Sequence, residues 1–416
     1  MTRHFFIFPP PPHPYAPRVT PEARPTSLTP SRQELAGVFS ILLVFLLVNA
    51  LVGTLTPTVY MDEPEHTDPA ANLYFGHGFT STAWAQPHTA FWSGYVPLYS
   101  GILWLWFKLA GFGFFQARFI NTLLAAFGGL LIWSAVRRNG LIRESSSRLL
   151  CLALVLSGSV STLTFRTIRP DTAMFALCAL VFFLCSLTSL GVTRYLVVAL
   201  TCLLLPFAGL PILPYIALLL VLIVLFYGFG NLRAMLAIGC GLAVGIGALL
   251  LFYRQFLALD SFLHFLLPST ILNSAAPGTS SLHNKIFGES LGSANLFTSF
   301  FGNPLEFRSQ ANLFDYSAAL LFAALIVLSL SAWPAVARAR QFALFMLAVT
   351  LLVPPGIYFA GHFPSYYRWM TYIPLAIAVP RLLEIHRAAT LRTSGQRGDG
   401  GESEKQQRGR QCFYEA

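Results

Sequence analysis

Charged residues are scarce in this sequence, and that scarcity excludes a large class of proteins. They make up only 11% of the 416 residues, whereas hydrophobic residues make up 55%. An ordinary soluble domain carries about 25% charged residues. The composition therefore excludes a soluble globular protein and predicts an all-α, polytopic membrane protein.

Several chemical signatures are also missing. The six cysteines show no CxxC spacing, and all except Cys412 lie in apolar runs, where thiols behave as small hydrophobes. The sequence has no Walker loop, no GxGxxG after a strand and no HExxH. A disulfide framework, a zinc site and nucleotide-driven pumping are therefore not indicated. No cofactor is expected, and a divalent metal stays open.

Acidic residues are outnumbered, which gives the chain a formal charge of +10. An excess of this size can indicate nucleic-acid binding. Here, however, the basic residues fall in short connections between apolar segments, as the positive-inside rule requires. We therefore expect a lipid bilayer, and no nucleic acid, as the partner of these charges.

About ten apolar segments are candidates for membrane-spanning helices, each near the roughly 20 residues that a crossing needs. With these spans, the basic loops fall on the side of both termini, which are predicted to be cytoplasmic. The predicted organisation is a Pro-rich disordered tail (1–34), a transmembrane domain (35–385) and a polar tail (386–416). The candidate spans are residues 36–55, 117–136, 148–165, 171–190, 195–209, 211–229, 234–253, 316–336, 341–360 and 371–384.

Three longer loops are predicted on the outer side, at residues 56–116, 254–315 and 361–370. Within the first, residues 97–111 are apolar but short for a span, so we expect a helix in the membrane interface, with Lys108 snorkelling outward. A second interfacial helix is expected at residues 256–267. The long loops point to a functional site on the outer side of the membrane.

An acidic cluster, Asp62, Glu63, Glu65 and Asp68, follows the first span directly. Ionisable residues at a bilayer boundary are costly and usually functional, so Asp62 is the candidate general base. The alternative is that these acids cap and solvate a short helix entered through Pro64. Glu63 and His66, three residues apart, are only a weak indication of a metal site.

A second group, Arg166, Arg169 and Asp171, lies between two predicted spans. Guanidinium groups beside a helix N-terminus could hold a phosphate or diphosphate. The alternative is a helix begun by Pro170, with Arg169 paired to Asp171. Arg368, among aromatic residues of the last outer loop, is either a phosphate ligand or an anchor in the aromatic belt.

The order of these motifs resembles the GT-C class of membrane glycosyltransferases, such as protein O-mannosyltransferases and lipid A aminoarabinose transferases. Tyr60-Met61-Asp62-Glu63 is similar to the Asp-Glu loop of that class. Val96-Pro97-Leu98-Tyr99 is similar to its Pro-Pro-Leu-Tyr segment, with Val96 in place of the first proline. Arg169-Pro170-Asp171 is similar to its Arg-x-Asp element. The resemblance covers residues 36–190 and extends loosely to 385.

This resemblance implies an inverting enzyme that moves a sugar from a polyprenyl-phosphate donor to a lipid, glycan or protein acceptor outside the cell membrane. Asp62 would be the general base, with Glu63 beside it. The implied substrate-binding residues are Tyr99, Arg166, Arg169, Asp171 and Arg368. The alternative is a transporter or flippase of a lipid or organic anion, which would use the same charges as a relay.

Overall fold

The structure is a computed structural model. It describes residues 29–55, 62–82, 87, 89–94, 96–157, 164–187, 190–209, 232–266, 323, 324, 327, 369, 370 and 372–388. Across these residues the regular elements are helices, and none is a strand. The predicted all-α class is confirmed for this part of the chain.

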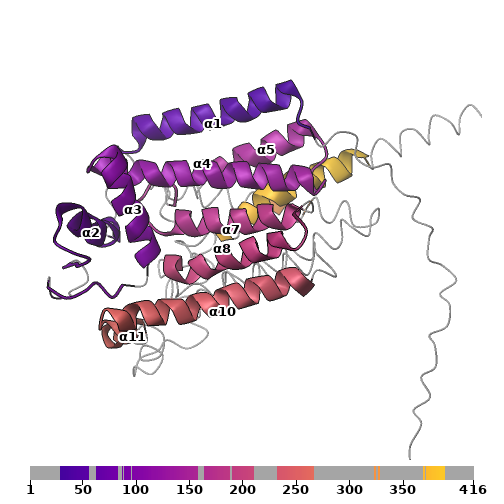
Figure 1. Cartoon of the computed structure of the whole chain (residues 1–416). Helices are drawn as coiled ribbons and strands as arrows, with labels where there is room; N and C mark the ends of the chain where they lie inside the picture. The colour runs from indigo at the N-terminus through magenta and orange to yellow at the C-terminus, as the bar shows by residue number, and fades with distance from the viewer. Residues whose placement is uncertain are drawn as a thin grey trace, which may run out of the picture.

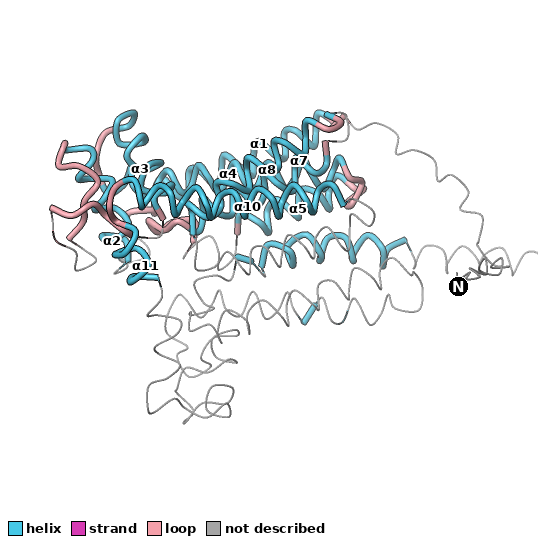
Figure 2. The backbone as a smooth tube through the Cα atoms, turned by 60° about the horizontal axis from the view of Figure 1, so that its bottom comes forward, coloured by secondary structure: helices cyan, strands magenta, loops and turns pink. Residues whose placement is uncertain are grey.

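The described helices form a bundle whose long members run side by side, with short helices gathered at one end (Figures 1 and 2). Residues 372–388 form a further helix, drawn in yellow in Figure 1. The helices are α1 (Arg32–Val52), α2 (Asp62–Phe75), α3 (Pro97–Ala110), α4 (Phe114–Arg138), α5 (Ser145–Leu156), α7 (Asp171–Ser186), α8 (Thr193–Gly209), α10 (Leu232–Gln255) and α11 (Leu259–Leu266).

Among the described residues, three helices, α1, α4 and α10, are long and apolar enough to cross a membrane. They coincide with the predicted spans 36–55, 117–136 and 234–253 to within four residues at either end. Large apolar side chains on α1 and α10 are exposed, as expected of surfaces that contact lipid. These helices are those of a membrane protein.

Helices α5, α7 and α8 are apolar but shorter, and they overlap the segments predicted as spans 148–165, 171–190 and 195–209; α7 lies inside its segment, whereas α5 and α8 begin two or three residues before theirs. The last predicted span corresponds to the helix at residues 372–388. The predicted spans 211–229 and 341–360, and nearly all of 316–336, lie outside the described residues.

The two helices expected in the interface both form. Helix α3 starts with Pro97 in its first turn, where a proline costs no hydrogen bond, and ends before Gly111, whose φ of 85° suits glycine. Lys108 lies over the ring of Tyr74, 4.7 Å from its centroid. Helix α11 forms within the predicted segment 256–267.

Side-chain contacts fix the direction of the first long helices. The indole of Trp133, near the end of α4, donates to Glu34 at the start of α1. Arg118, at the start of α4, donates to the carbonyl of Gly53, which follows α1. Helices α1 and α4 are therefore antiparallel. We call the end of the bundle with α2 and α3 the α2–α3 end, and the other the opposite end (Figure 1).

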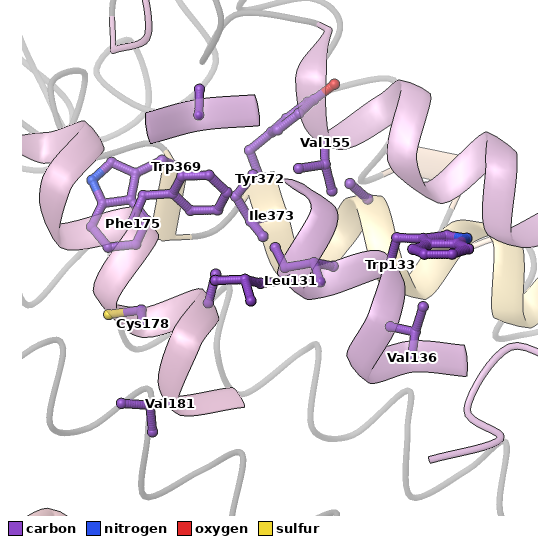
Figure 3. Packing of buried hydrophobic residues seen from close by; sticks show 14 of the residues in the cluster. Leu131, Trp133, Val136, Val155, Phe175, Cys178, Val181, Trp369, Tyr372 and Ile373 are labelled. Carbon is purple, nitrogen blue, oxygen red and sulfur yellow. The ribbon is translucent and has the colours of Figure 1, made fainter. Parts of the chain in front are cut away.

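Helix α7 is the central element, packed between α4 and α8. Phe175 on α7 meets Trp369 edge to face, with ring centroids 6.1 Å apart, and Figure 3 shows the two side chains next to each other. Gly128 of α4 lies directly under the Phe175 ring. The main apolar core therefore joins α7 to α4 and to the helix that follows Trp369.

A buried carboxylate organises the opposite end. Glu34 accepts two hydrogen bonds of 2.6 Å from Arg148 of α5, and others from Ser145 and Trp133. Glu384 accepts from the backbone amides of Arg143 and Glu144, which precede α5. Residues far apart in the chain are thereby joined at this end.

Helices α8 and α10 approach closely at two glycines, and replacing either should destabilise the protein. A Cβ on Gly245 would lie 2.5 Å from the carbonyl oxygen of Leu203 and 2.9 Å from Cγ of Pro206, and a Cβ on Gly241 would meet the carbonyl of Ala199. We expect Gly241→Ala or Gly245→Ala to lower the free energy of unfolding by about 1–3 kcal/mol, as overpacking does.

Thermal unfolding of the purified protein in detergent would measure the loss, and α10 supplies matched controls. A Cβ on Gly239 or Gly247 would meet nothing within 4 Å. Gly239→Ala and Gly247→Ala should therefore be neutral, or stabilising by up to about 1 kcal/mol through helix propensity. Equal effects at all four glycines would contradict this packing.

Candidate functional site

The α2–α3 end contains a buried pair of opposite charges, Glu63 and Arg118. Glu63 Oε1 and Oε2 accept from Arg118 Nη2 and Nε at 2.7 and 2.9 Å, and both side chains are almost fully buried. The remaining Arg118 nitrogen donates to the carbonyl of Gly53 at 2.7 Å, and the guanidinium lies over the Phe114 ring. One guanidinium thus joins α2, α4 and the chain that leaves α1.

A second buried junction joins α3, α4 and the loop before α7. The hydroxyl of Tyr99 donates to Asn121 Oδ1 at 3.2 Å. The amide of Asn121 in turn donates to the carbonyls of Thr167 and Arg169. Tyr99 and Asn121 are fully buried, and burial raises the pKa of the tyrosine well above its usual value. Tyr99 is therefore an uncharged hydrogen-bond donor.

Arg169 and Asp171 form the second ion pair of this end, with Arg169 Nε 3.0 Å from Asp171 Oδ2. Asp171 is fully buried and stands in the first turn of α7, where a carboxylate favours the helix dipole. Trp369 lies beside it. This pairing of Arg169 with Asp171 is the alternative that the sequence predicted, together with a helix that begins at Pro170. The structure contains both the ion pair and the helix.

His66 of α2 faces the same group of residues. Its ring meets that of Tyr99 edge to face, with centroids 6.3 Å apart. Burial, and next the positive charge of Arg169, lower the pKa of His66 to about 3. His66 is therefore neutral at physiological pH. It adds a polar but uncharged group beside Tyr99, within the influence of Arg169.

The structure thus brings together four of the residues predicted from sequence, Glu63, Tyr99, Arg169 and Asp171. The charges of Glu63, Asp171 and Arg169 all act on Tyr99. We call these four residues, with His66, Arg118 and Asn121, the buried polar cluster.

Arg166 is the predicted residue that lies elsewhere. Its Nε donates to Asn49 Oδ1 of α1 at 2.7 Å, and the guanidinium is half-buried. Asn49 Nδ2 donates to the carbonyl of Phe45 one turn earlier. Arg166 therefore belongs to the flank of the bundle formed by α1, and its partner is a neutral amide.

Two predicted site residues, Asp62 and Arg368, have side chains that lie outside the described residues. Asp62 is the first residue of α2, so the short helix expected after the first span does begin at the acidic cluster. Its side chain is outside what the structure describes, as is the whole of Arg368. Asp62 is next to Glu63 in sequence, and Glu63 is held by Arg118. The backbone that carries Asp62 is therefore tied to the cluster.

Asp68, another acid of α2, holds the loop that follows this helix. Its Oδ2 accepts from the hydroxyl of Ser81 at 2.7 Å and from the amide of Thr82 at 3.0 Å.

Within the described residues no group of three or more His, Cys, Asp or Glu side chains could hold a metal ion. The pair Glu63 and His66 is accordingly a part of the buried polar cluster.

Sequence reasoning missed three polar residues, Arg118, Asn121 and Asn49. Each lies in an otherwise apolar helix, α4 or α1. A polar side chain inside a spanning segment is costly without a partner, and this rule alone could have marked all three. It could not have identified the partners on other elements, because those partners lie between 22 and 117 residues away in sequence.

The cluster offers chemistry of a definite kind. Buried arginines can stabilise negative charge on a phosphate, and the oxygen of Tyr99 can accept a hydrogen bond while its proton is donated to Asn121. The arrangement is suited to binding an anionic group.

No protein-family model matches this sequence, and no curated protein matches it either.

The Glu63 and Arg118 pair should be strongly coupled energetically. Removing one partner of a buried ion pair leaves an uncompensated charge, which costs about 3–5 kcal/mol. We expect Glu63→Gln and Arg118→Met each to lower the free energy of unfolding by that amount, and the double variant to lose less than the sum. Thermal or denaturant unfolding in a double-mutant cycle measures this. Additive losses would show that the pair is not formed.

His66 should make the protein less stable in acid. The histidine titrates near 6.5 when the chain is unfolded but near 3 when folded, so the unfolded chain binds a proton that the folded one does not. Stability from His66 is complete above pH 6.5 and is lost as the pH falls towards 3. The free energy of unfolding of His66→Gln should therefore depend less steeply on pH in that range than that of the wild type, by up to about 1.4 kcal/mol per pH unit. Thermal unfolding at a series of pH values measures this.

The exposed His77, which follows the same helix, provides the control. His77→Gln should leave the acid dependence of the wild type unchanged. If His66→Gln and His77→Gln behave alike, the burial of His66 is not the cause.

Proposed function

We propose that this protein transfers a sugar from a polyprenyl-phosphate donor to a lipid, glycan or protein acceptor, as a GT-C-like membrane glycosyltransferase. The observation that carries the proposal is the buried polar cluster at one end of an apolar helical bundle, directly beside the helix that Asp62 begins. A lipid-anchored donor needs no nucleotide site, and its phosphate needs cations at the membrane boundary.

The proposed reaction is a single displacement with inversion. The carboxylate of Asp62 takes the proton of an acceptor hydroxyl while the acceptor oxygen bonds to the anomeric carbon. The bond from that carbon to the phosphate oxygen breaks on the opposite face, and its electron pair leaves with the lipid phosphate. Arg169, with Arg368 from the last predicted outer loop, would stabilise this charge as it increases.

Glu63 and Tyr99 would act as positioning and binding groups. Glu63 is bonded twice to Arg118, so it fixes the backbone beside Asp62 rather than accepting the proton itself. Tyr99 donates its hydroxyl proton to Asn121, so it would contact substrate as an acceptor, through its oxygen. Asp171 would hold Arg169 in place.

The topology that accompanies this function has about ten spans, with both termini cytoplasmic and the α2–α3 end facing outward. The arginines at the opposite end support this orientation, since Arg137, Arg138, Arg143 and Arg148 all occur there, at the end of α4 and the start of α5. Such an arrangement suits the inner or cell membrane, where the donor lipid is available on the outer leaflet.

The competing function is transport of a lipid or organic anion, and one observation favours it. The bundle has buried ion pairs at both ends, Glu63 with Arg118 and Glu34 with Arg148. Transporters close each side of a pathway with such pairs. Glu34 and Arg148, however, join the neighbouring helices α1 and α5 at the flank of the bundle, rather than facing each other across it.

Sugar transfer by the purified protein in lipid vesicles tests the proposal. The donors are synthetic polyprenyl-phosphate sugars with a radiolabel, and the comparison is wild type with Asp62→Asn. We expect the wild type to consume at least one donor and the variant to be about 10²–10⁴-fold slower, as loss of a general base usually is.

Glu65→Gln is the matched control, because it removes the same charge from the same helix. It should retain most of the activity. Consumption of no donor by the wild type, together with movement of a labelled lipid across the vesicle membrane, would refute the transferase and support the transporter.

A further inference from the structure

We infer that Arg166 and Asn49 form a second binding site on the α1 flank, for the phosphate group of a membrane lipid, separate from the buried polar cluster. The inference does not depend on the sugar transfer proposed above. The proposed ligand is a lipid that carries a phosphate group, either as a monoester or as a diester.

The first argument is the balance of charge at the α2–α3 end. Arg118 is neutralised by Glu63, and Arg169 by Asp171. Within the described part of the chain, Arg166 donates to the neutral amide oxygen of Asn49. The cationic charge of Arg166 is therefore the one left over in this group of three arginines.

The second argument is the cost of that charge. The guanidinium of Arg166 is half-buried, and burial lowers its pKa from the usual value. A cation partly withdrawn from water at a bilayer boundary is unfavourable unless an anion compensates it. An anion that approaches from outside the protein would supply what the described residues do not.

The third argument is the geometry of the guanidinium. Asn49 accepts from Nε, so the edge formed by the two Nη atoms remains for a ligand. That edge matches two oxygens of a phosphate, each at hydrogen-bond distance. Asn49 is itself held by its bond to the carbonyl of Phe45, which fixes the direction of the edge.

The position of Arg166 and Asn49 at the end of α1 indicates that the phosphate belongs to a lipid. Asn49 lies in the last turn of α1, between lipid-facing residues such as Val48 and Leu51, the latter 74% exposed. Lipid headgroups lie at the ends of spanning helices, where arginines between helices bind their phosphates. The buried polar cluster is a different place, because Arg169, and not Arg166, acts on His66, Tyr99 and Asp171.

The test is binding of two lipid probes by the full-length protein in phosphatidylcholine nanodiscs, without any sugar donor. One probe is farnesyl phosphate, a prenyl monoester, and the other is phosphatidylglycerol, a phosphodiester. Native mass spectrometry and the midpoint of thermal unfolding report binding. We expect at least one probe to bind wild type, and Arg166→Gln to weaken it by about 10-fold to 100-fold.

Two further variants make the result specific. Arg254→Gln removes the same charge from an exposed arginine at the end of α10 and should bind like wild type. Asn49→Leu keeps the charge but releases the guanidinium, and it should weaken binding by a smaller factor. If Arg166→Gln does not fold, Asn49→Leu against Arg254→Gln decides the question.

The two probes distinguish the source of the phosphate. Tighter binding of farnesyl phosphate would assign the site to a lipid phosphate monoester, and equal or tighter binding of phosphatidylglycerol would assign it to a bilayer phospholipid. Equal binding by wild type and Arg166→Gln, or equal losses in Arg166→Gln and Arg254→Gln, would overturn the site. Because no sugar is present, a failure of sugar transfer would leave this result unaffected.

Discussion

The arrangement of the α2–α3 end depends on one interaction, the buried ion pair of Glu63 and Arg118. A single guanidinium bonds to a carboxylate of α2 and to the backbone after α1, while its own residue belongs to α4. Helix α2 also packs Ala70 and Tyr74 against α3, and the ion pair adds its connection to α4 and to the end of α1. The pair thus fixes the helix that Asp62 begins against the helix that carries Asn121.

Asn121 extends this constraint to the rest of the cluster. The side chain of Asn121, on α4, accepts from Tyr99 of α3 and donates to the loop before α7. One amide group therefore holds α3, α4 and this loop together. Buried polar networks of this kind contribute mainly to a unique arrangement rather than to net stability.

The two ends of the bundle use similar chemistry for different purposes. At the opposite end, Glu34 bonds to Arg148, and Glu384 accepts from two backbone amides before α5. Those bonds join the helix ends that meet at this end of the bundle. At the α2–α3 end, in contrast, the charges adjoin neutral polar groups, His66 and Tyr99, whose pKa values burial has shifted to keep them uncharged. Shifted neutral groups among paired charges are typical of functional sites.

The sequence by itself determined the local elements of this protein. Runs of apolar residues identified the long apolar helices α1, α4 and α10 and the short helix α3, because hydrophobic length and Pro97 or Pro170 at a helix start act over a few residues. It also identified Glu63, Tyr99, Arg169 and Asp171 as unusual. Only the tertiary structure decided that these four meet, that Arg166 lies with Asn49 instead, and that Arg118 completes the group. The reason is that ion pairs and amide bonds between helices join residues distant in the chain, and no local pattern encodes such partners.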